Sequence, residues 1–113
     1  MKNVIYSISL AALIAASGAV AQDIDSIAIL TPEAGTDFGW NQQGVDAAKA
    51  AAAATGLKIV IADGLGYGDV RAPMRELAAE GVGLMIAHAS GYNTAGPEIA
   101  EETGVPVAVV DSP

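Results

Sequence analysis

The chain has 113 residues and a formal net charge of −8, from 13 acidic and 5 basic side chains. This acidity argues against nucleic acid and anionic membranes as partners, because both are bound through clustered Lys and Arg residues. The sequence contains no cysteine, so no disulfide bond stabilises the fold and stability must come from packing alone.

Residues 1–21 have the pattern of a secretory signal peptide. Lys2 supplies a positive charge, Val4 to Ala16 form an apolar core, and Ala19-Val20-Ala21 is a small-x-small cleavage site. The alternative is a membrane anchor, but polar and glycine residues interrupt this run, and a membrane span needs roughly 20 apolar residues. We therefore expect cleavage near Ala21 and release of residues 22–113 into the periplasm, as a segment long enough to bury one core.

After this leader, short apolar runs alternate with helical stretches. We expect strands at Ser26–Leu30, Leu57–Ala62, Val82–Ala89 and Val105–Asp111, and helices at about Trp40–Thr55, Val70–Ala79 and Pro97–Thr103. The runs are almost continuously apolar, as in parallel strands that are covered on both faces. Gly56, Gly81 and Gly104 each follow a helical stretch, where a residue with positive φ ends the helix. The order βαβαβαβ predicts an α/β fold with a doubly wound parallel sheet.

In such a sheet, ligands bind outside the carboxyl ends of the strands, where the strand order switches. The stretch from Thr36 to Gly44 follows the first strand and therefore reaches this edge. It contains the chain's one Phe and one Trp, Phe38 and Trp40, beside the polar residues Asp37 and Asn41. Aromatic rings stack on flat ligands, and carboxylate and amide groups bond the ligand edges, so the stretch predicts a binding site.

Other residues at the same edge are open to two interpretations. Trp40 could pack into the core, and Asn41 could cap the helix that follows it. Tyr67 and Tyr92 either line the site or only cover their loops, and Tyr92 is favoured because it directly follows the third strand. The residues after Asp111 reach the same edge, so we include Asp111 among the expected contacts.

The catalytic alternative depends on His88, the only histidine, and on Ser90. Two residues apart on one strand, they could approach each other and act as a small periplasmic hydrolase. No G-x-S-x-G motif surrounds the serine, and one histidine without cysteine argues against a metal site. We therefore expect no enzyme, and place His88 and Ser90 at the rim as ligand contacts. The other interpretation is that His88 makes its hydrogen bonds within the protein and does not contact a ligand.

A nucleotide cofactor is not expected either. Gly64-Leu65-Gly66-Tyr67-Gly68 follows the second strand, but its spacing differs from the G-x-G-x-x-G of dinucleotide-binding loops. That fingerprint belongs after the first strand, and the turn from Thr31 to Gly35 lacks it. We interpret the glycines as a flexible turn.

The order of these features resembles the basic membrane protein (BMP) family of ABC-transporter substrate-binding proteins. The resemblance depends on the leader, on Ile27-Ala28-Ile29-Leu30 and on Asp37-Phe38-Gly39-Trp40-Asn41-Gln42. The segment from Met74 to Ala87 is also similar to the second helix and third strand of that family. The remainder is similar to type I periplasmic binding proteins in general, which include sugar and autoinducer binders.

The resemblance implies a two-lobed receptor that closes over a small solute and delivers it to an ABC permease in the inner membrane. Characterised members bind purine nucleosides or similar heterocycles. For this chain the resemblance implies that Trp40 is the stacking ring and that Asn41 contacts the edge of the base. It also implies that Asp37 accepts a hydrogen bond from a hydroxyl group or from the base. Ser90 and Tyr92 would be contacts from the third-strand rim. A chemosensory or quorum-signal receptor with the same fold remains an alternative.

Members of that family are considerably longer than this chain. We therefore expect residues 22–113 to be the N-terminal part of the first lobe, without the second lobe. A solute that binds with micromolar affinity has a binding free energy of about −8 kcal/mol. If the two lobes contribute equally, one lobe alone retains about −4 kcal/mol, which corresponds to a millimolar affinity. The expectation is weak binding by this chain alone.

Overall fold

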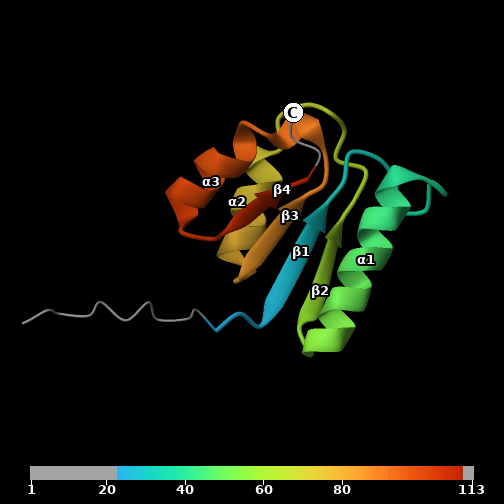
Figure 1. Cartoon of the computed structure of the whole chain (residues 1–113). Helices are drawn as coiled ribbons and strands as arrows, with labels where there is room; N and C mark the ends of the chain where they lie inside the picture. The colour runs from blue at the N-terminus through green and yellow to red at the C-terminus, as the bar shows by residue number, and fades with distance from the viewer. Residues whose placement is uncertain (1–22, 111–113) are drawn as a thin grey trace, which may run out of the picture.

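The computed structural model describes residues 23–110, so the predicted signal peptide and Asp111 lie outside the described residues. The described residues fold as an α/β unit with four parallel strands and three α-helices (Figure 1). In chain order the elements are β1 (Ser26–Leu30), α1 (Trp40–Thr55), β2 (Lys58–Ala62), α2 (Arg71–Ala79), β3 (Leu84–Ala87), the 3-10 turn η1 (Ser90–Tyr92), α3 (Ala95–Thr103) and β4 (Val107–Val109). This confirms the predicted fold class.

The sheet has the strand order β2-β1-β3-β4. Leu30 at the end of β1 pairs with Ala62 of β2 and with Ala87 of β3, and Ala87 pairs with Val109 of β4. All four strands therefore end at the same edge. The chain moves outward from β1 to β2 and then returns to the other side of β1 with β3, so the strand order switches between β1 and β3. This switch point is where open α/β sheets bind ligands.

Helices cover the two faces of the sheet unequally. Figure 1 shows α1 on one side and both α2 and α3 on the other. Side chains alternate along β1, so Ala28 and Leu30 join the large core under α2 and α3, whereas Ile29 joins a small core under α1. The small core holds only Val45 and Ala48 of α1 as buried members, because α1 faces the sheet mainly with small residues.

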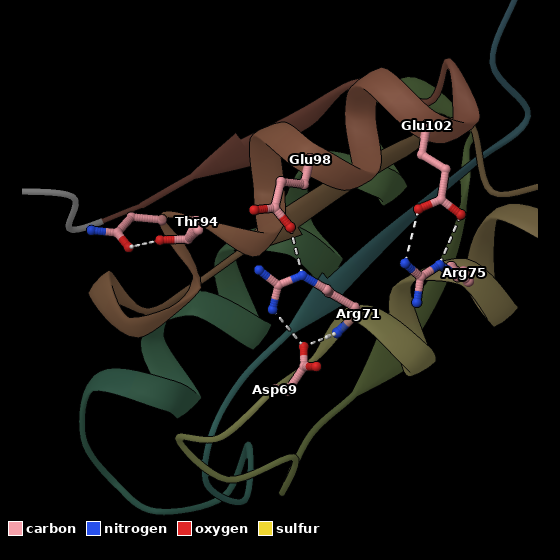
Figure 2. Close-up of polar contacts among 7 residues, drawn as sticks. Asp69, Arg71, Arg75, Thr94, Glu98 and Glu102 are labelled. Carbon is pink, nitrogen blue, oxygen red and sulfur yellow. Dashed lines mark hydrogen bonds and ion pairs between the residues drawn. The ribbon is translucent and has the colours of Figure 1, made fainter.

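Paired charges link α3 to α2 across their exposed sides (Figure 2). Arg71 Nε donates to Glu98 at 2.6 Å, and Arg75 donates two hydrogen bonds to Glu102 at 2.8 and 2.9 Å. Arg71 also contacts Asp69 at 2.9 Å. Exposed pairs of this kind contribute little to stability. The pairs lie one helical turn apart on both helices, beside the shared apolar core of Met74, Leu77 and Ile99.

The elements differ from the predicted ones mainly at the strands. The third strand was expected to begin at Val82, but Val82 N donates to Leu77 O at 3.1 Å and so belongs to the turn that ends α2. The edge strands are also less covered than expected, and Ile61 of β2 is 39% exposed. The helix ends agree with the prediction, since Gly56, Gly81 and Gly104 have φ of 74°, 91° and 74°.

None of the helices within residues 23–110 is both long and apolar enough to cross a bilayer. Over the same residues, no group of three or more His, Cys, Asp and Glu side chains is placed to hold a metal ion.

Candidate functional site

A cavity of about 300 Å³ opens at the carboxyl edge of the sheet, among the loops that follow β1, β2 and β3. Three successive loops and one helix end supply its walls. Its lining residues are Pro32, Glu33 and Asp37 after β1, Trp40 and Asn41 at the start of α1, Tyr67 after β2, and Ala89 and Ser90 after β3. Its volume is at the lower end of the range of ligand pockets, and its position is the switch point of the sheet. We refer to it as the rim cavity.

Trp40 forms one wall of the rim cavity, and His88 supports it from behind. The two rings stack with centroids 4.4 Å apart and planes 11° apart. Trp40 Nε1 donates to His88 O at 3.3 Å, and His88 Nε2 lies 3.0 Å from Trp40 O. A carbonyl oxygen only accepts, so Nε2 carries the proton in this contact. Trp40 lines the rim cavity and remains 45% exposed, so part of the residue is accessible there.

Gly44 explains how α1 comes close enough to form this stack. A Cβ at Gly44 would lie 2.5 Å from His88 Cδ2 and Nε2. Only glycine lets the helix backbone approach the imidazole to this distance. The His88 ring is therefore enclosed between the Trp40 ring and the backbone of α1, and the residue is only 7% exposed.

This position corrects the expectation that His88 contacts a ligand at the rim. His88 lines a separate apolar groove between α1 and the sheet, whereas Ser90 lines the rim cavity, where its ligand contact stays a prediction. No hydrogen bond joins His88 to Ser90 among residues 23–110. The pairing that a hydrolase would need is therefore not formed there.

Asp37 lies at the cavity, but its carboxylate is occupied by the chain itself. Oδ1 accepts from Gly39 N at 2.8 Å and Gln42 N at 3.0 Å, and Oδ2 accepts from Asn41 Nδ2 at 2.7 Å and Asn41 N at 3.3 Å. These bonds, led by that from the Asn41 side chain, lower the pKa of Asp37 to about 2. Asp37 was expected to accept from a ligand. The structure instead uses it to satisfy the N–H groups at the start of α1 and to orient Asn41.

Asn41 is a buried polar residue of the cavity with unused bonding capacity. It is only 3% exposed, and its Nδ2 donates to Asp37. Its Oδ1 is buried without a hydrogen-bond partner among the described residues. An unpaired buried acceptor destabilises a fold by about 1–3 kcal/mol. Asn41 lines the rim cavity, but this oxygen atom is itself buried from solvent.

Phe38 does not line the rim cavity. It is 93% exposed and adopts φ of 59°, a left-handed conformation that bulky residues rarely take. Phe38 N donates to Gln42 Oε1 at 3.0 Å, which helps to hold this conformation. A ligand contact from Phe38 therefore stays a prediction.

The two tyrosines of the rim loops, each open to two interpretations from the sequence, differ in exposure. Tyr92 is fully buried, and its hydroxyl donates to Gly66 O at 2.7 Å. Burial, with a smaller contribution from Tyr67, raises the pKa of Tyr92 to about 12. Tyr67 is 67% exposed and lines the cavity. Tyr92 is buried because the 3-10 turn Ser90–Tyr92 directs its side chain under the loops.

The loop after β2 is fastened to the loop after β1. Leu65 N donates to Thr31 O at 3.1 Å, Gly66 N to Pro32 O at 2.8 Å, and Gly64 N to Glu33 O at 3.1 Å. Gly64 and Gly66 have φ of 67° and 76°. The glycines therefore provide backbone conformations for a fixed turn, rather than the flexible turn that the sequence suggested.

Glu33 lines the cavity although it was not predicted as a site residue. The one sequence signal for Glu33 was its position in the loop after the first strand, which the predicted topology places at this edge of the sheet. Its residue type does not distinguish it, because the chain contains 13 acidic residues. Asp111, the remaining predicted contact, lies outside the described residues.

Comparisons with known proteins agree with the fold. No protein-family model matches the chain, and no curated protein matches it. Among solved structures, it is similar to an ABC transporter system solute-binding protein from Conexibacter woesei DSM 14684, with a TM-score of 0.64 and 23% sequence identity. The match covers 72% of this chain but 27% of that structure. At this identity the likeness shows a shared fold, and membership of the BMP family stays a prediction.

Proposed function

We propose that this chain is part of a solute-binding protein of an ABC importer and provides one wall of a site for a small heterocyclic solute, such as a purine nucleoside. The single observation that carries the proposal is the Trp40 ring. One face is supported by His88, and the residue is 45% exposed at the rim cavity. Stacking of a base on an aromatic side chain is worth about 1–3 kcal/mol.

The surroundings of Trp40 support a polar, flat solute. Asn41, Ser90 and Glu33 line the same cavity. Their side chains can bond the edges of a ring that lies on the indole. The fixed loops also favour binding, because contacts that are already ordered lose little entropy when a ligand arrives.

The cellular role in this proposal follows from two further observations. The leader pattern of residues 1–21 supports export to the periplasm. The fold similarity to an ABC transporter system solute-binding protein supports delivery of the solute to a permease. In this proposal, the second lobe of such a receptor supplies the opposite wall of the site.

A sugar or autoinducer-type receptor, for import or for sensing, is the second candidate. Glu33 and Asn41 present acceptors that also fit sugar hydroxyls, and aromatic rings pack on the apolar faces of sugars. A small hydrolase is not favoured, because His88 Nε2 is engaged with Trp40 O at 3.0 Å.

The fluorescence of Trp40 tests the proposal, because it is the one tryptophan of the chain. The full chain, shown to be folded by circular dichroism, is titrated with adenosine, guanosine, free purines and pentoses. We expect saturable quenching by the purines at millimolar concentrations and none by the pentoses. Quenching by pentoses alone would favour the sugar receptor. A folded chain whose emission no solute changes would contradict a heterocycle site at Trp40.

A further inference from the structure

The groove between α1 and the sheet is a second cavity, separate from the rim cavity, with a volume of about 340 Å³. Ile29, Ile86 and Val110 contribute to it from the sheet side, and the small residues of α1 between Gly44 and Ala51 form its wall. Helix α1 packs mainly on β1 and β2, so this face of the sheet is covered less over β3, and the groove lies there. We refer to it as the α1 groove.

The lining of the α1 groove is apolar except for one histidine. Among the described residues that form it, His88 is the only one with a polar side chain. Small-molecule pockets are likewise mainly apolar, with a few polar groups that orient the ligand, and the volume is at the lower end of their range. An ion or a sugar would not recover there the hydrogen bonds that it makes with water, so the groove fits a small apolar molecule better.

His88 has one ring nitrogen that the protein leaves unused. Its Nε2 donates to Trp40 O at 3.0 Å, so in the neutral ring Nδ1 is an acceptor. Among residues 23–110 no hydrogen bond reaches Nδ1, and the one fully buried side-chain nitrogen or oxygen without a partner is Asn41 Oδ1. Nδ1 is therefore unpaired but still accessible. It belongs to a residue that is only 7% exposed and that lines the α1 groove rather than the rim cavity.

We propose that the α1 groove binds a small, uncharged apolar molecule with one hydrogen-bond donor, such as a phenol, and that this donor bonds to His88 Nδ1. The apolar body of the molecule lies between Ile86 on the sheet and Ala51 on the helix, which both line the groove. A charge or a second donor would have no partner among these side chains and would oppose binding. The site is separate from the rim cavity and holds whether or not a heterocycle binds at Trp40.

The test for the place of binding is an NMR titration of the isotope-labelled full chain with phenol. The amide signals of Gly44, Ala51 and Ile86 should move saturably at millimolar concentrations. Ala51→Leu should weaken phenol at least about tenfold, because the leucine side chain would occupy the space of the ligand. The matched control is Ala53→Leu, since both alanines are exposed on α1 and only Ala51 lines the groove. Equal phenol affinity in both variants, or shifts confined to residues of the rim cavity, would overturn the proposal.

The test for the hydrogen bond follows the imidazole nitrogen signals of His88, the only histidine of the chain. The titrations are run at pH 8, where imidazole is ordinarily neutral. Phenol should move the Nδ1 signal with the same affinity as the amide signals of the groove, whereas anisole, which lacks the O–H donor, should move it far less. Equal Nδ1 shifts with both probes, or none with bound phenol, would overturn the assigned acceptor.

Sedimentation analysis at the same protein concentration tests the other occupant of an apolar groove, a second copy of the chain. The native chain should be monomeric with and without phenol. A native dimer that Ala51→Leu dissociates, and that Ala53→Leu leaves intact, would show that a second copy covers the groove and would overturn the small-molecule site.

Discussion

Gly44→Ala tests whether α1 is packed on the His88 ring. Glycine in a helix interior is normally less stable than alanine by about 0.5–1 kcal/mol, so this change would ordinarily stabilise a protein. Here the new methyl group would meet His88 Cδ2 and Nε2 at 2.5 Å and Cγ at 2.8 Å. The imidazole cannot move away freely, because it is stacked on Trp40 at 4.4 Å and bonded to Trp40 O.

Overpacking of a filled site destabilises by about 1–3 kcal/mol, which outweighs the gain in helix propensity. We therefore expect Gly44→Ala to lower the free energy of unfolding by about 1–2 kcal/mol and to change the emission of Trp40. Urea denaturation followed by circular dichroism measures the first effect, and fluorescence measures the second.

The control is Gly68→Ala, since nothing lies within 4 Å of a Cβ placed at Gly68. This variant should show neither effect. A Gly44→Ala variant that is more stable than the native chain, with unchanged Trp40 emission, would refute the contact between α1 and His88.

Two further predictions concern the residues that hold the rim. Tyr92→Phe removes the hydrogen bond to Gly66 O and should lower the free energy of unfolding by about 0.5–1.5 kcal/mol in urea denaturation. Burial favours the neutral phenol and raises the pKa of Tyr92 from 10.0 to about 12. The native chain should therefore lose stability between pH 10 and 12 more steeply than Tyr92→Phe, and identical curves would show that the hydroxyl is not buried. Asp37→Asn tests how stability depends on pH in the acidic range. The pKa of Asp37 is lowered from 3.8 to about 2, so its contribution is complete above pH 3.8 and is lost as the pH falls through 2. The melting temperature of Asp37→Asn should be lower than that of the native chain at neutral pH, and the two should converge toward pH 2. A constant difference between them down to that pH would contradict the bonding assigned to Asp37.

The sequence carried enough information to predict the fold because its local signals agree with one another. Four apolar runs, three alanine-rich or amphipathic stretches and a glycine after each helix all indicate the same βαβαβαβ order. The first helix was predicted with its observed bounds, Trp40–Thr55. The third strand was predicted too long, because the apolar residue Val82 fits the strand pattern. In the structure its N–H donates to Leu77 O at the end of α2. Edge strands also cannot be distinguished from central ones until the strand order is known.

The site was only partly predictable, because its roles depend on contacts between distant segments. Topology placed Trp40, Asn41 and Ser90 at the correct edge, and all three line the cavity. The stacking of Trp40 on His88 joins residues 48 positions apart and has no local signature. Asp37 was interpreted as a ligand contact, although an acid shortly before a helix is also what caps the helix start. For Tyr92 the sequence left open whether it lines the site or covers a loop, and the structure buries it within the 3-10 turn Ser90–Tyr92.

The most direct test of the central claim, that Trp40 is the wall on which a solute stacks, is the NMR signal of its indole N–H. The chain has one tryptophan, so an isotope-labelled sample gives one such signal. Titration with adenosine should move this signal saturably, together with the amide signals of Glu33, Asn41 and Ser90, which line the same cavity. A folded chain in which the indole signal stays fixed while signals elsewhere move would contradict the account.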